Sequence, residues 1–317
     1  MPASLPSPAR PPLPVALARQ PDYAPAGLAV CIDALCAACG FAPPRGARVL
    51  VKPNLVSALR GPLACSEPAL VAAACAWLLD HGAKPWVGDS PAFGTARSVG
   101  RRIGLDAALA PLKVPLRNLG RPARLALDFG GAVGISRDAL EADLILSLPR
   151  LKAHGQLRLT AGGKNLFGCV AGARKALAHS RFGEQGTRFE SLLVQVMAAL
   201  PPVFTLLDGI VAMSRTGPSG GDPLPLGLLA ASPSPVALDT ALFTALRQTP
   251  QDVATWAECL RRGLPGARRD EVAFPLLPPE AFDFSGFIVP NSLDAVSFHP
   301  LRLLKGAYKR LNARLFG

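Results

Sequence analysis

The sequence is poor in aromatic residues and in lysine, and it lacks the fingerprints of several common protein classes. Aromatic side chains make up 6% of the 317 residues, and no stretch alternates arginine with tyrosine or phenylalanine as a stacking surface for single-stranded nucleic acid does. The formal net charge is +12. Nucleic acid is therefore a weak candidate as a partner, which leaves phosphorylated metabolites, carboxylates or an acidic membrane surface.

Neither a secretory signal nor a membrane-spanning segment is expected. Prolines interrupt the opening stretch MPASLPSPARPPLPVALARQPDYA, which has no unbroken apolar core. The longest apolar window, residues 68–79, is too short to cross a bilayer. We therefore expect a cytoplasmic protein whose residues 1–14 form a disordered, proline-rich N-terminus.

The seven cysteines do not form the paired framework of a secreted fold. Cys31, Cys36 and Cys39 have the spacing with which plant-type ferredoxins begin their cluster motif. They lie, however, in GLAVCIDALCAACGF, which is typical of an apolar helix. We interpret them as buried core thiols and expect no iron–sulfur cluster in this chain.

Strands and helices alternate along the chain. The predicted strands are residues 15–19, 47–51, a strand ending at residues 88–90, 143–148, 203–207 and 226–231. The predicted helices are residues 25–40, 67–81 with Ser66 as N-cap, 95–109 and 236–247. This pattern predicts a single α/β domain over residues 15–290: a mainly parallel sheet sandwiched by helices, with glycine-rich active-site loops at the C-terminal ends of the strands.

Polar motifs follow four of these strands. They are Lys52-Pro53-Asn54, Gly88-Asp89-Ser90-Pro91, the stretch from Pro149 to His154, and Asp208-Gly209. In open α/β sheets, ligands bind outside the carboxyl ends of the strands. The sequence therefore predicts a binding site at this edge.

The segment SLPRLKAHGQLRLTAGGKNLFGCVAGARKALAHSRFG, residues 147–183, contains no acidic residue. Its basic residues include Lys152, Lys164 and Arg174, and six glycines are spread among them. Glycines let backbone N–H groups approach an anion, and lysine and arginine supply charge. We favour an anion site over a solvated basic loop because the segment follows a strand end.

Two of the four histidines, His154 and His179, lie in this segment. Each is a candidate acid–base group, metal ligand or simple hydrogen-bonding residue, and His154 is preferred because it follows a buried strand. The fixed-spacing metal motifs HExxH and CxxC are absent. Whether a metal binds stays open, with His154, Asp208 and Asp239 as candidate ligands.

Two glycine-containing turns have both a structural and a functional interpretation. GDSPAFGTA, residues 88–96, leads into a helix that Ser90 or Thr95 would cap, and it is either an anion site or an ordinary turn. TGPSGGDP, which contains Gly220 and Gly221, is either a backbone anion nest, a mobile lid or a plain surface loop. P-loop, GxGxxG and GxSxG fingerprints are absent.

The C-terminal residues 291–317 predict a basic amphipathic helix. Leucines and Tyr308 share one helical face between Leu301 and Phe316, and lysines and arginines make the rest basic. Such a helix docks on its own domain, on a partner or on an anionic membrane surface.

Seven ordered blocks of sequence resemble the domain of unknown function 362 family. They are VLVKPNLV, GDSPAFGTA, ADLILSLPRLKAHG, GGKNLFG, HSRFG, LLDGIVAMSRTGPSGGDPLPLGLLAA and SPVALDTA, within residues 15–266. Members look like bacterial and archaeal α/β proteins, many fused to or neighbouring ferredoxin modules. The resemblance implies a redox-linked setting, but this chain lacks a CxxCxxCxxxCP run, so electrons would come from a ferredoxin-type partner.

The resemblance and the residue pattern together indicate a set of functional positions. The expected catalytic residues are His154, Lys152, Lys164 and His179. The expected substrate-binding residues are Lys52, Asn54, Asp89, Ser90, Asn165, Arg174, Gly220 and Gly221.

These positions predict an enzyme acting on a small carboxylate or phosphate. The lysines and Arg174 would hold the anion, His154 would act as acid or base, and Asn165 would orient the substrate. A redox step with an external electron donor is the favoured reaction, which would make the protein an oxidoreductase. The alternatives are a non-catalytic accessory partner of an iron–sulfur protein and a membrane-surface protein.

Overall fold

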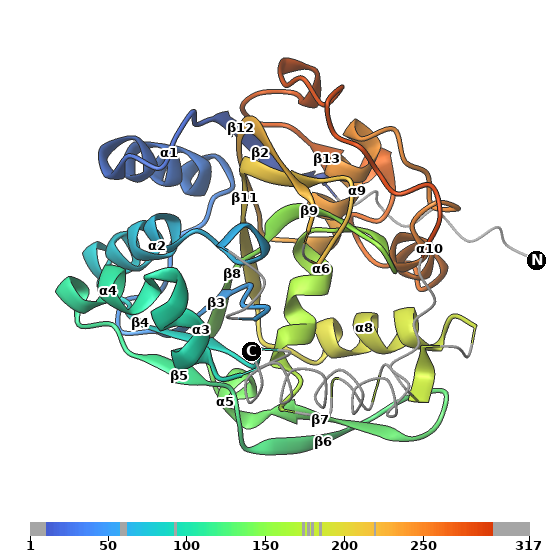
Figure 1. Ribbon diagram of the computed structural model, residues 1–317, viewed down its shortest axis with the longest axis horizontal. Coiled ribbons are helices and arrows are strands. Elements are labelled where there is room, and N and C mark those ends of the chain that lie inside the picture. The colour runs from blue at the N-terminus through green and yellow to red at the C-terminus, as the bar shows by residue number, and fades with distance from the viewer. Residues whose placement is uncertain are drawn as a thin grey trace, which may run out of the picture.

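The computed structural model describes residues 11–57, 62–91, 94–172, 175, 178, 181–183, 186–218 and 220–293. A nine-stranded sheet lies at its centre with helices on both faces (Figure 1). The strands of this sheet are β2 (Ala16–Arg19), β3 (Arg48–Pro53), β4 (Lys84–Asp89), β5 (Leu116–Asn118), β8 (Leu144–Leu148), β9 (Arg150–His154), β10 (Arg158–Thr160), β11 (Val203–Ser214) and β12 (Asp222–Ser232). The longer helices are α1 (Pro25–Ala38), α2 (Pro68–Asp80), α3 (Ala96–Ile103), α8 (Arg188–Ala198), α9 (Pro235–Ala245) and α10 (Ala254–Arg261).

Most strand pairings are parallel, which confirms the predicted fold class. The pairs β3–β4, β4–β5, β3–β8, β8–β11 and β9–β11 are parallel. The antiparallel pairs are β11–β12, β12–β2 and the β9–β10 hairpin. The central parallel strands β3 and β8 are buried on both faces, as their largely apolar sequences require.

Strands β8 and β9 run one after the other along the same side of β11. Strand β8 pairs with residues 203–205 of β11, and β9 pairs with it from Asp208 onward. Pro149 separates them, and its carbonyl oxygen accepts a hydrogen bond from the N–H of Asp208 at 2.8 Å. Strand β3 ends at Pro53, opposite Leu148. Beyond that point β9 pairs with β10 instead, so the sheet opens where the polar motifs lie.

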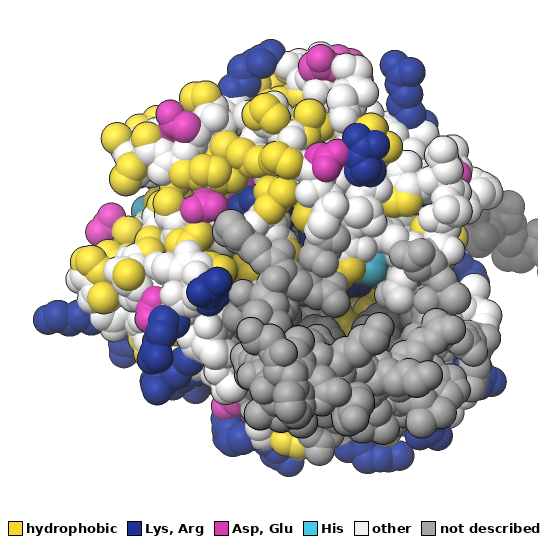
Figure 2. Space-filling view, in the orientation of Figure 1, with side chains coloured by type: hydrophobic (Ala, Val, Ile, Leu, Met, Phe, Trp, Pro, Cys, Tyr) yellow, Lys and Arg dark blue, Asp and Glu magenta, His cyan; other side chains and the backbone are white. Residues whose placement is uncertain are grey.

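Side chains alternate between two hydrophobic layers. Val49 and Val51 pack with the layer of α1, α2 and α3, whereas Leu50 packs with α8 and with the hairpin of β6 (Pro122–Ala126) and β7 (Ala132–Ser136). Helix α9 covers the same side as α8, over β11 and β12. The surface of α1 and α2 is largely apolar, and basic side chains gather over α3 and α4 (Leu105–Leu109) (Figure 2).

Several predicted elements differ from the observed ones. The helix predicted at residues 95–109 breaks into α3 and α4 at Gly104, where φ is 82°. The stretch from Pro149 to His154, predicted as a polar motif after the end of a strand, itself contains β9. Ser66 does not cap α2, whose N-cap is Glu67. The Ser66 hydroxyl instead accepts a hydrogen bond from the N–H of Asn54 and donates one to the carbonyl oxygen of Leu148.

Some elements were not predicted at all. Strand β5, the β6–β7 hairpin, α8 and α10 were missed, and β11 and β12 are longer than predicted. In β6 the side chains alternate between exposed and half-buried without a strongly apolar face, so its sequence carries a weak strand signal.

One predicted boundary, the end of the disordered N-terminus at residue 14, is wrong. Leu13 and Pro14, predicted as disordered, form β1 (Leu13–Pro14), which pairs with β13 (Val272–Ala273). Residues 1–10 and 294–317 lie outside the described residues, and so does most of the predicted C-terminal helix. Within the described part, no helix has the length and apolar composition needed to cross a bilayer.

The predicted core thiols are buried. Cys31 and Cys36 lie on the inner face of α1, and Cys39 follows its end. Burial raises the pKa of the Cys36 thiol to about 12, so it stays protonated at neutral pH.

Substitution of Phe204 on β11 tests how tightly the hydrophobic layer beneath α1 and α2 is packed. Its ring stacks on Phe41 with centroids 3.8 Å apart, and 1% of the residue is exposed. We expect Phe204→Ala to lower the free energy of unfolding by about 3–5 kcal/mol, because it leaves a cavity in a packed layer. Urea denaturation measures this. Val30→Ala, at a residue 73% exposed, is the control and changes stability by less than about 0.5 kcal/mol; similar losses in both variants would contradict the assignment.

Candidate functional site

The site is organised around a buried ion pair at the ends of two adjacent strands. Lys52 of β3 and Asp89 of β4 are 2.9 Å apart, and their side chains are 1% and 3% exposed. The Asp89 carboxylate also accepts hydrogen bonds from the backbone N–H groups of Leu55 and Ser90, both at 2.7 Å. The two predicted positions therefore meet, but they bind each other.

The predicted amides hold the backbone of this region. The Asn165 side chain, at the end of α6 (Gly162–Asn165), donates to the carbonyl oxygen of Lys52 at 3.0 Å and to the Ser147 hydroxyl at 2.9 Å. Asn54 donates from its side chain to the carbonyl oxygen of Ala64 at 2.7 Å. Both residues thus fix the main chain that surrounds the ion pair.

Gly168 lets the chain after α6 approach the ion pair closely. It lies in η3 (Leu166–Cys169). A Cβ atom there would lie 2.3 Å from Cε and Nζ of Lys52 and 2.7 Å from Oδ1 of Asp89. The GKNLFG block therefore needs this glycine for space.

Two further lysines, Lys152 and Lys175, lie near this pair, and a third, Lys164, lies close to both of them. The Lys152 Nζ, on β9, donates to the carbonyl oxygen of Ala64 at 3.2 Å, and the Lys175 Nζ donates to the carbonyl oxygen of Ser90. Burial, and secondarily the charges of Lys164 and Arg150, lower the pKa of Lys152 to about 7. Burial lowers the pKa values of Lys164 and Lys175 to about 8.

We call Lys52, Lys152, Lys164 and Lys175 the lysine cluster. Among the ion pairs of the described residues, only Lys52–Asp89 involves one of these four side chains. Lys152 is close enough to Lys164 for their charges to repel, and Lys175 is close to both Lys52 and Lys164. The cluster thus concentrates more positive than negative charge in a poorly solvated region, which suits an anion.

His154 lies on the same face of β9 as Lys152, two residues further on, and it is buried. Its Nδ1 accepts hydrogen bonds from the backbone N–H groups of Gln156 at 3.1 Å and Leu157 at 3.3 Å. An accepting Nδ1 carries no proton, so the ring is neutral with its proton on Nε2.

The three candidate metal ligands are not brought together. Asp208 pairs with Arg150 at 2.9 Å and accepts a hydrogen bond from the Tyr23 hydroxyl at 2.8 Å. Asp239, on α9, accepts from the N–H groups of Gly162 at 2.6 Å and Gly163 at 3.0 Å. Among the residues that the structure describes, no group of three or more His, Cys, Asp or Glu is placed to hold a metal ion.

Burial raises the pKa of both carboxyls, Asp208 and Asp239. That of Asp239 rises to about 7, because the two backbone hydrogen bonds only partly offset its desolvation. That of Asp208 is also raised by burial, against the opposing effect of Arg150. Both carboxyls therefore have structural partners that the sequence did not reveal.

Of the remaining predicted site residues, the structure describes Ser90, Gly220 and Gly221 but neither Arg174 nor His179. The Ser90 hydroxyl accepts from the N–H of Gly172 at 2.9 Å, which ties the glycine-rich segment to β4. Gly220 and Gly221 lie in the connection between β11 and β12, whose Gly217 carbonyl accepts from the N–H of Gly155. That connection therefore packs beside the end of β9. Arg174 and His179 lie outside the described residues.

The turn at residues 88–96 holds an ordinary helix cap. The Thr95 hydroxyl accepts from the N–H of Ser98, and the side chain of Asn118 accepts from the N–H of Ala96. These two groups use N–H donors that an anion at the start of α3 would need. The predicted cap at Thr95 is confirmed, and the anion site at this turn stays a prediction.

Sequence reasoning missed Lys175 and Gly168 as members of the site. Lys175 stood among the basic residues of the acid-free segment, but nothing in its spacing distinguished it from its neighbours. Gly168 lay within the GKNLFG block, which the family resemblance already marked.

The pKa of Lys152 makes stability depend on pH. In the unfolded chain Lys152 keeps its proton up to its ordinary pKa of 10.5, whereas the folded protein releases it above about 7. The unfolded state therefore binds more protons between these values, and this group makes stability rise with pH there, by up to about 1.4 kcal/mol per pH unit.

Lys152→Met removes this dependence. We expect its stability advantage over the wild type to be largest at pH 6–7 and to shrink towards pH 9.5, as measured by urea denaturation across that range. The exposed Lys84→Met is the control variant. An advantage that is constant with pH would show that Lys152 is not buried in this way.

Gly168→Ala tests the close approach to the ion pair. The added methyl group overlaps Lys52 and Asp89, so we expect a loss of about 1–3 kcal/mol in the free energy of unfolding. Gly120→Ala is the matched control, because its new Cβ would lie 4.0 Å from the nearest atom. Equal thermal midpoints for the two variants would argue against the packing described.

Comparisons with solved structures give remote likenesses. The lactate racemase apoprotein from Thermoanaerobacterium thermosaccharolyticum matches with a TM-score of 0.41 and 14% identity, over 61% of this chain and 50% of that one. A Thermotoga maritima protein matches with a TM-score of 0.39 and 13% identity, over 66% and 54%. This chain therefore spans about half the length of the solved structures that it matches.

Sequence comparisons are closer. A thylakoid-associated protein of Synechocystis sp. is 39% identical over 272 residues, which cover 85% of this chain and 84% of the relative. The family model described as Domain of unknown function (DUF362) matches residues 49–244, which hold the lysine cluster and its surroundings. The chain therefore belongs to the DUF362 family.

Proposed function

We propose that this protein is an enzyme that binds a small carboxylate- or phosphate-bearing substrate at the lysine cluster and transfers a proton through Lys152. The observation that carries the proposal is the imbalance of charge: four lysines lie close together, and among the described residues only Lys52 is paired with a carboxylate, that of Asp89. Such an imbalance costs stability in a poorly solvated region unless an anion balances it.

An anion would change the protonation of the cluster. Negative charge beside Lys152 and Lys164 favours their charged forms, so binding raises both pKa values and takes up protons near neutral pH. Above about pH 8 these lysines have lost their protons in the free protein, and binding weakens.

Lys152 suits proton transfer because its pKa of about 7 lies near neutral pH. A group with such a pKa exists in both forms and can accept or donate a proton at small cost. His154 follows it on the same face of β9 with a neutral ring, and we propose that it assists as the second acid–base group. Lys52, fixed by Asp89, would supply constant positive charge to developing negative charge on the substrate.

The redox step, the external electron donor and the ferredoxin-type partner rest on the family resemblance, and they stay proposals. The membrane-surface alternative rests on residues 294–317, outside the described residues, and the name of the Synechocystis relative keeps it open.

Calorimetric titration with malonate and with inorganic phosphate tests the binding step. At pH 7.5 we expect binding to the wild type with net proton uptake, visible as a dependence of the heat on the buffer's ionisation enthalpy. Lys152→Met and Lys164→Met should weaken binding about tenfold or more, because each removes a charged partner. Lys84→Met is the control; unchanged affinity in both cluster variants would refute the proposal.

Turnover separates the enzyme from the accessory alternative. The wild type and Lys152→Met are incubated with a cell metabolite extract in D₂O and compared by mass spectrometry. Conversion or deuterium incorporation specific to the wild type supports the enzyme. Identical profiles with anion binding intact would support a non-catalytic accessory protein.

A further inference from the structure

A cavity lies away from the lysine cluster, between α9 and residues 272–287. Its volume is about 680 Å³, within the range of pockets that hold small organic ligands. The carboxylate of Asp239 on α9 binds the amides of α6, whereas the next residue, Thr240, lines this cavity. Successive helical residues point about 100° apart, so the two sites use different faces of α9.

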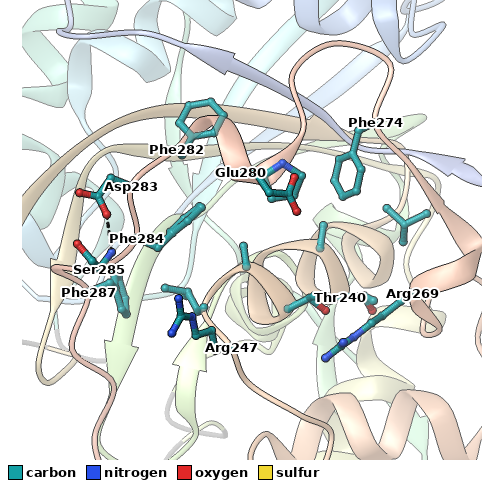
Figure 3. A pocket seen from close by; sticks show the side chains of 16 residues that line it. Thr240, Arg247, Arg269, Phe274, Glu280, Phe282, Asp283, Phe284, Ser285 and Phe287 are labelled. Carbon is teal, nitrogen blue, oxygen red and sulfur yellow. Dashed lines mark hydrogen bonds between the residues drawn. The ribbon is translucent and has the colours of Figure 1, made fainter.

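One wall of the cavity is aromatic. Phe274, Phe282, Phe284 and Phe287 all come from the segment that faces α9 (Figure 3). Phe282 and Phe284 have ring centroids 6.4 Å apart. At this separation the two rings pack against each other, and a flat apolar group can lie beside them against the wall.

The floor of the cavity carries two threonine hydroxyls that lack hydrogen-bond partners among the described residues. Thr240 and Thr244 lie one turn apart on α9, and their buried Oγ1 atoms have no hydrogen-bond partner among the described residues. Only 1% of Thr240 is exposed. A buried hydroxyl without a partner costs free energy, and buried hydroxyls are normally satisfied. In this structure neighbouring protein atoms cover both oxygen atoms, so a ligand's acceptor oxygen reaches them only when the side chains around them shift.

Two arginines continue this polar side. Arg247 follows the end of α9, one turn beyond Thr244, and Arg269 lies across the cavity floor from it (Figure 3). Arg269 stacks over the ring of Trp256 at 5.9 Å. Guanidinium groups match the planar fork of a carboxylate.

The acidic residues in the lining limit the charge of the ligand. Glu280 and Asp283 also line the cavity, and the Asp283 carboxylate accepts from the N–H of Ser285 at 2.9 Å. The two arginines and two carboxylates leave the lining without net charge, but the arginines lie on the α9 side and the carboxylates on the facing segment (Figure 3). A singly charged anion beside the arginines is therefore opposed less than a doubly charged phosphate.

We propose that this cavity is a second ligand site, for a flat, apolar carboxylate. The ligand's ring packs against the phenylalanines, and its carboxylate accepts hydrogen bonds from Thr240 and Thr244 and pairs with Arg247 and Arg269. The site is independent of the lysine cluster.

The test uses two probes of the same shape on the full chain: naphthalene-2-carboxylate and the uncharged 2-naphthamide. Calorimetry should show the carboxylate binding about tenfold more tightly or better. The double variant Arg247→Gln with Arg269→Gln should lose this preference and leave the amide's affinity unchanged. The exposed Arg102→Gln on α3 is the control.

Thr240→Val provides a second, independent readout. It should weaken carboxylate binding severalfold and raise the thermal midpoint of the unliganded protein, because a buried hydroxyl without a partner is removed. A role confined to packing would not produce both effects.

Lys152→Met separates this proposal from the lysine cluster. It should leave the affinity for naphthalene-2-carboxylate unchanged while it weakens malonate binding. Equal affinity of the wild type for the two naphthalene probes, unchanged binding in the double arginine variant, or loss of naphthalene-2-carboxylate binding in Lys152→Met would each overturn the second site.

Discussion

The ion pair between Lys52 and Asp89 constrains everything around it. Leaving one partner of a buried ion pair alone costs several kcal/mol, so the ends of β3 and β4 must stay in register. The rest of the region conforms to the pair: backbone amides complete the Asp89 carboxylate, and Gly168 offers no side chain where one would collide. A charged pair in a packed interior thereby fixes both the sheet edge and the glycine-rich segment above it.

The position of Lys152 depends on the break at Pro149. Because β3 ends opposite Leu148, β9 continues beside β11 without a neighbour from β3, and its Lys152 and His154 face the space beyond the strand ends. The chain around Ala64 covers Lys152. This cover excludes water, lowers the pKa of Lys152 to about 7 and gives the residue a chemical use that an exposed lysine lacks.

Stability and function oppose each other in this arrangement. A protein selected for stability alone would not place Lys152, Lys164 and Lys175 around one carboxylate, because their mutual repulsion and lost hydration favour unfolding below neutral pH. Unsatisfied hydroxyls at Thr240 and Thr244 present the same conflict on the far side of α9. Both features are consistent with the two ligand sites that we propose.

The sequence by itself determined the sheet and the edge at which the site lies. Apolar runs such as residues 144–148 predict strands buried on both faces, and polar residues after parallel strands meet at one edge, so Lys52 and Asp89 were found together. Only the tertiary structure decided which polar residues bind one another and which gather in the lysine cluster. Asp239 and Gly162 bind each other across 77 residues of sequence, and Asp208 and Arg150 across 58, so pairings between distant segments used up these carboxylates. Local pattern cannot reveal such partners, nor the burial that lowers the pKa of Lys152, because both arise from segments that meet only on folding.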